Sequence, residues 1–274
     1  MSNLVSTAWL ADHLRGVRVV DASWYMPEDK REPAKEFEVA HIPGAVFFDI
    51  DGIADHSTSL PHMMPTPGEF SKAVGDLGIG DEETVVVYDG TGMFSAPRVW
   101  WMLKAMGHED VRVLDGGFPK WQREGRALET GPARPQRKFL TAIPRPEIIR
   151  DFDAVMDIVK DGSAQMVDAR SNSRFTAQEP EPRAGVRGGH MPGAINVPWR
   201  SVVAEDATLK PNVALRAAFA HVDLRKPIVT TCGSGISAAV LMLALDEIGA
   251  REVALYDGSW AEWGSRPEAP VVTG

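Results

Sequence analysis

The chain has 274 residues, 44% of them hydrophobic and 24% charged, which is long enough for one large or two ordinary globular domains. A formal net charge of −9 argues against nonspecific binding to nucleic acid, which requires a basic face, so we expect no nucleic-acid partner. The single cysteine excludes an internal disulfide, and no group of Cys and His has the spacing of a zinc site.

The N-terminal sequence lacks the charged segment and apolar run of a secretory signal. No stretch approaches the ~18 apolar residues of a membrane span. We therefore expect a soluble protein with a cytoplasmic location and no membrane association.

Short valine-rich segments alternate with helical patterns in the first half. Residues 18–22, 84–88 and 111–114 are predicted to be buried parallel strands, and residues 96–106 a helix that ends before Gly107. This alternation predicts an α/β fold with a mainly parallel sheet flanked by helices.

A proline-rich segment follows. Residues 131–146 contain four prolines and few periodic apolar positions, which is typical of a linker. We therefore predict an N-terminal domain at 1–130, a linker at 131–146 and a C-terminal domain at 147–274.

The second half follows the same plan. Residues 152–160 read as a helix with Asp151 as its N-cap and Gly162 beyond its end. Residues 227–231 read as a buried strand, and residues 238–248 as an apolar helix.

The two halves share four sequence blocks in the same order, which indicates a duplicated domain with loop insertions. The paired blocks are 19–23 with 166–170, 40–46 with 189–195, 85–92 with 228–235, and 114–117 with 256–259.

Cys232 lies between a predicted strand and a predicted helix. Backbone N–H groups and the helix dipole favour an anion at such a place, here the nucleophilic thiolate. Gly233 and Gly235 allow positive φ angles or a close approach of the backbone to the sulfur. The alternative is a buried cysteine that only fills space.

The alignment of the two halves pairs Asp89 with Cys232. A carboxylate cannot form a persulfide, so only the second half can carry thiol chemistry. The first half is left with a supporting role.

These blocks, together with Cys232-Gly233-Ser234-Gly235-Ile236-Ser237-Ala238, resemble the two-domain rhodanese superfamily, and within it the 3-mercaptopyruvate sulfurtransferases. The resemblance covers nearly all of both halves and implies two tandem rhodanese-like domains, of which the second is catalytic.

The resemblance implies sulfur transfer from 3-mercaptopyruvate through a persulfide on Cys232, with release of pyruvate. The acceptor would be a thiol, thioredoxin being the expected partner, or cyanide. The chemistry requires no metal or organic cofactor.

The resemblance also implies the substrate-binding residues. Two arginines, Arg174 and Arg183, are expected to hold the donor's carboxylate and ketone, because a guanidinium pairs with a carboxylate through two parallel hydrogen bonds. The remaining expected substrate-binding residues belong to the loop after the strand and are Gly233, Gly235, Ile236 and Ser237.

A proton relay is a further implication of the resemblance. Ser234 would handle a proton and would be oriented by His62 and Asp51 from the first half. The alternative is that His62 is a loop histidine and Asp51 a turn residue. The repeated His41 and His190 are expected to hold turns and to take no part in catalysis.

Three other functions stay open at this level. The uncharged Gly233-Ser234 pair favours a keto acid over thiosulfate, because thiosulfate-preferring relatives carry Arg-Lys there, but a thiosulfate sulfurtransferase is an alternative. A cysteine phosphatase needs an arginine six residues after the cysteine, where this chain has Ala238. A non-catalytic sulfur carrier would accept sulfur on Cys232 without turnover.

Overall fold

The computed structural model describes residues 2–274, which form two compact units. The first unit contains residues up to 55 together with 64–145 and 204–209; the second contains 56–63, 146–203 and 210–274. Each unit thus includes one short segment from the other half of the sequence. The segment 56–63 brings His62 into the unit that holds Cys232.

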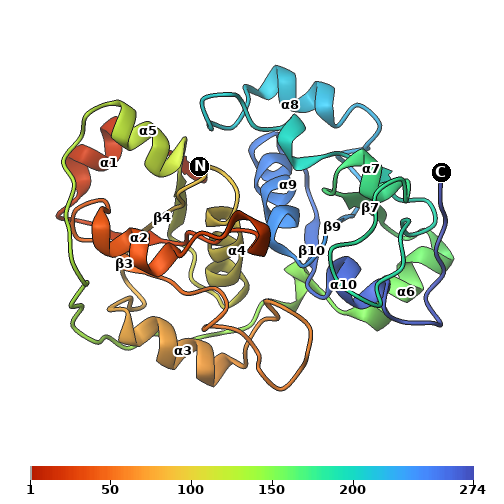
Figure 1. Cartoon of the computed structure of the whole chain (residues 1–274), viewed down its shortest axis with the longest axis horizontal. Coiled ribbons are helices and arrows are strands. Elements are labelled where there is room, and N and C mark those ends of the chain that lie inside the picture. Colours follow the sequence, from red (N-terminus) through yellow and green to blue (C-terminus); the bar gives the residue numbers. More distant parts are fainter. Residues whose placement is uncertain (1) are drawn as a thin grey trace. The chain divides into compact units, whose positions relative to one another are not determined.

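The first unit contains a parallel sheet in the order β1-β5-β4-β2-β3. Figure 1 labels β3 and β4 of this sheet and the helices α1 to α5 of the unit. Its strands are β1 (Leu4–Val5), β2 (Arg18–Asp21), β3 (Val46–Phe47), β4 (Val85–Tyr88) and β5 (Val111–Leu114). Its helices are α1 (Thr7–His13), α2 (Pro33–Val39), α3 (Pro67–Asp76), α4 (Ala96–Ala105) and α5 (Gly117–Arg123), with a 3-10 turn η1 (Pro27–Asp29).

The second unit repeats this order as β6-β10-β9-β7-β8, again all parallel. Its strands are β6 (Ile149–Arg150), β7 (Gln165–Asp168), β8 (Ile195–Asn196), β9 (Ile228–Thr231) and β10 (Val253–Tyr256). Its helices are α6 (Phe152–Asp161), α7 (Asn172–Phe175), α8 (Asn212–Ala218), α9 (Ile236–Glu247) and α10 (Ser259–Trp263), with 3-10 turns η2 (Pro146–Ile148) and η3 (Trp199–Ser201).

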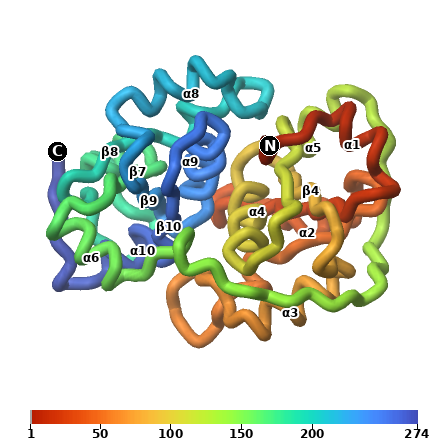
Figure 2. Tube along the Cα trace, turned by 180° about the vertical axis from the view of Figure 1, so that it is seen from behind, coloured from red at the N-terminus to blue at the C-terminus, as the bar shows by residue number. Residues whose placement is uncertain are grey.

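Helices cover both faces of each sheet. In the second unit, Val155 of α6 and Trp260 and Trp263 of α10 share a core with one face of β9 and β10. Helix α9 packs along the same two strands, as Figures 1 and 2 both show. Its side chains are apolar on all sides and nearly all buried, which is typical of a helix enclosed by a core.

In the first unit the same layers recur, with α1, α2 and α5 against one face and α4 against β4 and β5. Trp100 and Trp101 of α4 are fully buried. The predicted two-sheet α/β fold is therefore confirmed.

Local signals also match the structure. The Asp151 side chain accepts a hydrogen bond from the Ala154 N–H at 2.9 Å and so caps α6. Gly162 ends that helix with a positive φ of 70°. The predicted strands and helices are found within two residues of their expected bounds.

Residues 131–145 belong to the first unit, where the N–H groups of Lys138 and Ile143 donate to carbonyl groups near the ends of α3 and α4. The division at a linker 131–146 stays a prediction.

Candidate active site

Cys232 is the first residue after β9, the central strand of the second sheet. The four residues of β9 are all buried, so the chain emerges from the core at the carboxyl edge of the sheet, where open α/β sheets bind ligands. The thiol is free and its residue is 2% exposed.

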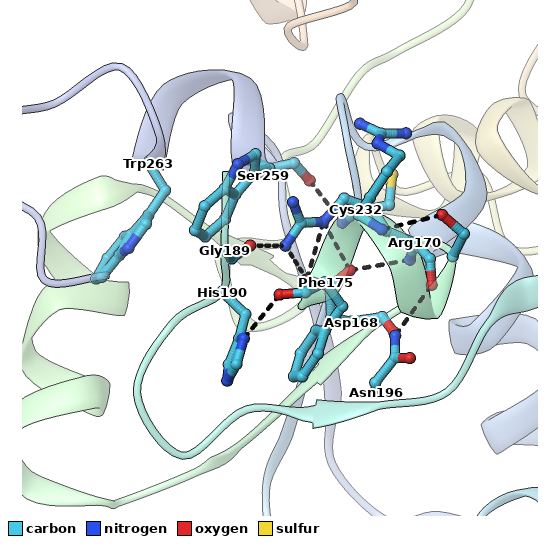
Figure 3. A network of polar contacts seen from close by, with 12 residues as sticks. Asp168, Arg170, Phe175, Gly189, His190, Asn196, Cys232, Ser259 and Trp263 are labelled. Atoms are coloured by element: carbon cyan, nitrogen blue, oxygen red, sulfur yellow. Dashed lines mark hydrogen bonds and ion pairs between the residues drawn. The ribbon is translucent and has the colours of Figure 1, made fainter. Parts of the chain in front are cut away.

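The backbone of the Cys232 loop, residues 232–235, is tied to α10. The N–H groups of Trp260 and Ala261 donate to the carbonyl oxygens of Cys232 and Gly233 at 2.9 and 2.8 Å. The Cys232 N–H donates to Ser259 Oγ at 3.2 Å, and Ser259 Oγ donates to the Tyr256 carbonyl at 2.8 Å. Figure 3 shows Ser259 beside Cys232. These bonds hold the loop in one conformation.

The two loop glycines serve different purposes. Gly235 has a φ of 80°, a left-handed conformation that favours glycine, and it starts α9. Gly233 does not have a positive φ, but a Cβ placed on it would lie 3.1 Å from Arg174 Nη2 and 3.6 Å from Nη1. The Arg174 guanidinium therefore lies directly against the residue that follows Cys232.

Four charged residues form a chain of ion pairs beside this loop. Arg170 Nη2 donates to Asp168 Oδ2 at 2.7 Å, and its Nη1 donates to Glu181 Oε1 at 2.8 Å. Arg174 donates to the same Glu181 carboxylate through Nε, at 3.3 Å from Oε1, and through Nη2 to Oε2. We call Asp168, Arg170, Glu181 and Arg174 the charge chain; its two carboxylates and two guanidinium groups balance.

The Arg170 guanidinium is held by hydrogen bonds and by an aromatic ring. It also donates to the Gly189 carbonyl at 2.7 Å and lies over the Trp260 ring at 4.1 Å; Figure 3 shows its bonds to Asp168 and Gly189. Burial alone would lower the pKa of Arg170, but the carboxylates of Asp168 and Glu181 together raise it above its ordinary value. Arg170 therefore stays charged.

Ser234, Ile236 and Ser237 follow the cysteine in sequence and are mostly buried. Ser234 is 7% exposed, and Ile236 and Ser237, in the first turn of α9, are 2% and 9% exposed. Arg183 lies in the loop after Glu181 and is half-buried. Its role in substrate binding stays a prediction.

The proposed relay residues fall in different units. His62 is 6% exposed, has a φ of 62°, and belongs with Ser234 to the second unit. Asp51 belongs to the first unit, where its carboxylate accepts a hydrogen bond from Trp24 Nε1 at 3.0 Å. The relay stays a prediction.

His41 and His190 make equivalent contacts in the two units. Nδ1 of His41 lies 2.7 Å from the Phe37 carbonyl, and Nδ1 of His190 lies 2.8 Å from the Phe175 carbonyl. Each imidazole stacks on the ring of the same phenylalanine. These contacts fit the structural role expected from the repeat.

The sequence did not lead us to predict a role for Arg170 or Glu181 in the site. Available signals were the arginine that ends the repeated block 166–170 and the glutamate two residues before Arg183. Neither signal identifies an ion partner, because the pairing depends on how the segments after β7 fold together.

The loop after β4, at residues 89–96, shows what the same backbone does with a carboxylate. Oδ1 of Asp89 accepts hydrogen bonds from two backbone N–H groups and Oδ2 from three, at 2.6 to 2.9 Å. The donors are Thr91, Gly92, Phe94, Ser95 and Ala96. The fold therefore builds an anion-binding nest at this position of the sheet.

Asp21 is the first-unit counterpart of Asp168, and its environment lacks the arginine. Ser23 stands where the second unit has Arg170. Burial, with a smaller contribution from the Asp89 charge, raises the pKa of Asp21 to about 6, although hydrogen bonds from Ser23 and Tyr88 act in the opposite direction.

Neither a metal cluster nor a membrane-spanning helix is found in residues 2–274. These residues contain no group of three or more His, Cys, Asp or Glu side chains placed to hold a metal ion. None of the helices they form is long and apolar enough to cross a membrane.

Comparison with known proteins places both units in one family. The model of the rhodanese-like domain matches residues 6–124 and 151–266. The chain is 43% identical to the 3-mercaptopyruvate sulfurtransferase of Escherichia coli, over 97% of this chain and 96% of that protein. It is 41% identical to the mitochondrial thiosulfate/3-mercaptopyruvate sulfurtransferase 1 of Arabidopsis thaliana, over 98% of this chain and 77% of that protein.

A solved structure agrees. The crystal structure of SseA from Escherichia coli, which represents the rhodanese fold of 3-mercaptopyruvate sulfotransferases, matches with a TM-score of 0.87 and 41% identity. The match covers 95% of this chain and 99% of that one.

Proposed function

Because this chain belongs to the rhodanese family, we propose that it is a sulfurtransferase that moves sulfur from 3-mercaptopyruvate to a thiol acceptor through a persulfide on Cys232. The observation that carries the proposal is the placement of the chain's single thiol at the end of a central strand. It is followed by Gly233, where a Cβ would lie 3.1 Å from the Arg174 guanidinium. A nucleophile and a carboxylate-binding group in this relation suit a small acidic sulfur donor.

The reaction has two halves. The Cys232 thiolate attacks the sulfur of 3-mercaptopyruvate, the C–S bond breaks, and the electron pair leaves on carbon as the enolate of pyruvate, which is then protonated. An acceptor thiolate next attacks the outer sulfur of the persulfide, so that the S–S bond breaks and the Cys232 thiolate returns. Thioredoxin is the protein acceptor we propose, and cyanide could replace a thiol.

The nest around Asp89 supports the persulfide step. In an aspartate the carboxylate oxygens lie two bonds beyond Cβ, and in a cysteine persulfide the outer sulfur lies two bonds beyond Cβ. The duplication aligns Ser234, Gly235 and Ser237 with three of the residues whose N–H groups bind Asp89. We infer that the N–H groups of the second loop bind the outer sulfur of the persulfide anion in the same way.

The remaining residues receive roles within this proposal. Arg174 and Arg183 hold the carboxylate and ketone of the donor, and Gly233, Gly235, Ile236 and Ser237 line the substrate site. Ser234 delivers the proton that the enolate needs, oriented by His62 and Asp51. A cytoplasmic location belongs to the same proposal.

The test is a steady-state comparison of two donors. We expect a higher kcat/KM for 3-mercaptopyruvate than for thiosulfate, because Gly233 and Ser234 carry no charge for a dianion. A higher value for thiosulfate would contradict the choice of donor. Sulfur uptake on Cys232 without multiple turnover would favour a carrier. Hydrolysis of a phosphate ester that is lost in Cys232→Ala would favour a phosphatase.

A further inference from the structure

The guanidinium of Arg174 is engaged along one edge and left open at another. Glu181 accepts hydrogen bonds from Nε and Nη2, so it occupies the side of the guanidinium. Nη1 of Arg174 donates no hydrogen bond to any of the residues 2–274. The Nη1–Nη2 end, which can bind a carboxylate through two hydrogen bonds, therefore remains available.

That open end faces the cysteine loop. Of the Arg174 atoms close to a Cβ built on Gly233, Nη2 is nearest at 3.1 Å, Nη1 follows at 3.6 Å and Cζ at 3.8 Å. The guanidinium thus approaches Gly233 with its Nη1–Nη2 end, where Nη2 also donates to Glu181 and Nη1 does not.

Exposure changes along the charge chain in the direction a binding site requires. The side chains of Asp168, Arg170 and Glu181 are 1%, 1% and 3% exposed, whereas that of Arg174 is 18% exposed. Three members are enclosed and hold one another, and the fourth can meet a ligand.

We propose that Glu181 is a positioning residue that holds the Nη1–Nη2 end of Arg174 over Gly233, and that this arrangement selects a sulfur donor with a carboxylate. The backbone conformation of Gly233 does not require glycine, but a side chain there would press against the guanidinium, since a Cβ would lie 3.1 Å from Nη2. A side chain at position 233 changes donor preference by displacing Arg174, whatever charge it carries itself. The inference takes its substrate class from the proposed function.

The first unit supports the steric part of this argument. Gly90 is the counterpart of Gly233, and a Cβ built on it would lie 2.2 Å from the Tyr25 hydroxyl. In both units the glycine after the central strand makes room for a side chain from the segment that follows the neighbouring strand.

The experiment measures alkylation of Cys232, the only cysteine, by iodoacetate and by iodoacetamide. In both reactions Sγ attacks the CH2 carbon and iodide leaves, but only iodoacetate carries a carboxylate for Arg174. We expect Glu181→Gln to lower the rate constant for iodoacetate roughly five- to tenfold through misplacement of the guanidinium, and to change that for iodoacetamide less than about twofold.

This expectation is opposite to a simple charge effect. Removal of a negative charge near the thiol should speed the reaction with an anion if Glu181 acts only through its charge. Glu179→Gln is the matched control, because Glu179 is exposed, lies in the same segment and bonds to Ser173. We expect it to leave both rate constants unchanged within about twofold.

Gly233→Ala tests the same arrangement independently and is decisive if Glu181→Gln does not fold. It should lower the iodoacetate rate constant selectively, because the added methyl group displaces the guanidinium. An unchanged or higher iodoacetate rate constant in a folded Glu181→Gln or Gly233→Ala variant would overturn the inference.

Kinetics with 3-mercaptopyruvate separate this inference from the proposed function. Glu181→Gln should raise KM and leave kcat within about twofold, because positioning of Arg174 acts on donor binding. If the wild-type protein does not turn over 3-mercaptopyruvate but alkylation follows the expected pattern, the proposed function falls and the arrangement stands. If the wild-type protein turns over 3-mercaptopyruvate but neither variant changes alkylation selectively, the proposed function stands and the arrangement falls.

Discussion

The loop after β4 and the loop after β9 follow equivalent central strands in two copies of one sheet, yet they hold different groups. The first encloses the Asp89 carboxylate with five backbone N–H groups, and the second presents a thiol. Beside the first loop, the buried Asp21 is followed two residues later by Ser23. Beside the second loop, the equivalent Asp168 is followed two residues later by Arg170, which donates hydrogen bonds to it.

After the duplication, the two copies took on different roles. The first copy satisfies its anion nest from within and needs no external ligand. The second copy leaves the equivalent place to a sulfur atom and adds a chain of charges that ends in Arg174. Substitutions at the nucleophile, the nest, the arginines and the buried carboxyl group test this difference between the two copies.

The largest effect is expected at the nucleophile. Cys232→Ser should lower kcat for sulfur transfer by at least about 10³-fold, because a serine hydroxyl cannot form a persulfide. Adding Asp89→Cys to this variant should not restore activity, since the segment after β2 has Ser23 where the second unit has Arg170. Restored turnover in the double variant would show that the two loops are interchangeable.

The nest around Asp89 comes next. Asp89→Ala leaves five backbone N–H groups without their acceptor, three of them from buried hydrogen bonds, so we expect the free energy of unfolding to fall by about 3 to 5 kcal/mol. Denaturant unfolding measures the change. Asp89→Asn keeps one acceptor oxygen, so its free energy of unfolding should lie between those of Asp89→Ala and the wild type. A loss below about 1 kcal/mol for Asp89→Ala would mean that the nest contributes little.

The arginines of the second unit give the third effect. Arg183→Ala should weaken donor binding by about 1.5 to 3 kcal/mol, seen as a KM for 3-mercaptopyruvate raised roughly tenfold or more, through loss of a charged hydrogen bond. Arg225→Ala is a suitable control, because that side chain is 83% exposed and pairs with Asp223. An unchanged KM for Arg183→Ala would remove Arg183 from the site.

The smallest effect concerns Asp21, whose pKa burial raises from 3.8 to about 6. The folded state binds the proton more tightly than the unfolded state, so stability is greatest at low pH and falls as pH rises through this window. Asp21→Asn should therefore raise the free energy of unfolding by about 1 to 3 kcal/mol above about pH 6 and by little below about pH 4. A constant difference between pH 4 and pH 7 would contradict this assignment.

Much of this molecule could be predicted from its sequence. Valine-rich strands, the Asp151 cap and the ordered repeats depend on local patterns, and they led to the two parallel sheets and to Cys232 at the end of a strand. The uncharged Gly233-Ser234 pair, from which we predict a keto acid as donor, can also be read directly from the sequence.

Features that depend on tertiary contacts could not be predicted. The charge chain joins Asp168 and Arg170 to residues in the segment that follows α7, and no spacing rule pairs Arg170 with Glu181. The inclusion of residues 56–63 in the second unit is equally invisible, because those residues belong to the first half of the repeat. The closeness of Arg174 to position 233 is likewise a tertiary contact that no sequence pattern predicts.

The central claim, that Cys232 carries the transferred sulfur, is tested most directly by a mass spectrum of the protein after incubation with 3-mercaptopyruvate and no acceptor. We predict one added sulfur atom on the peptide that contains Cys232, which disappears when a thiol acceptor is supplied. Pyruvate formation with no sulfur on this peptide, or with sulfur that a thiol cannot remove, would contradict the account.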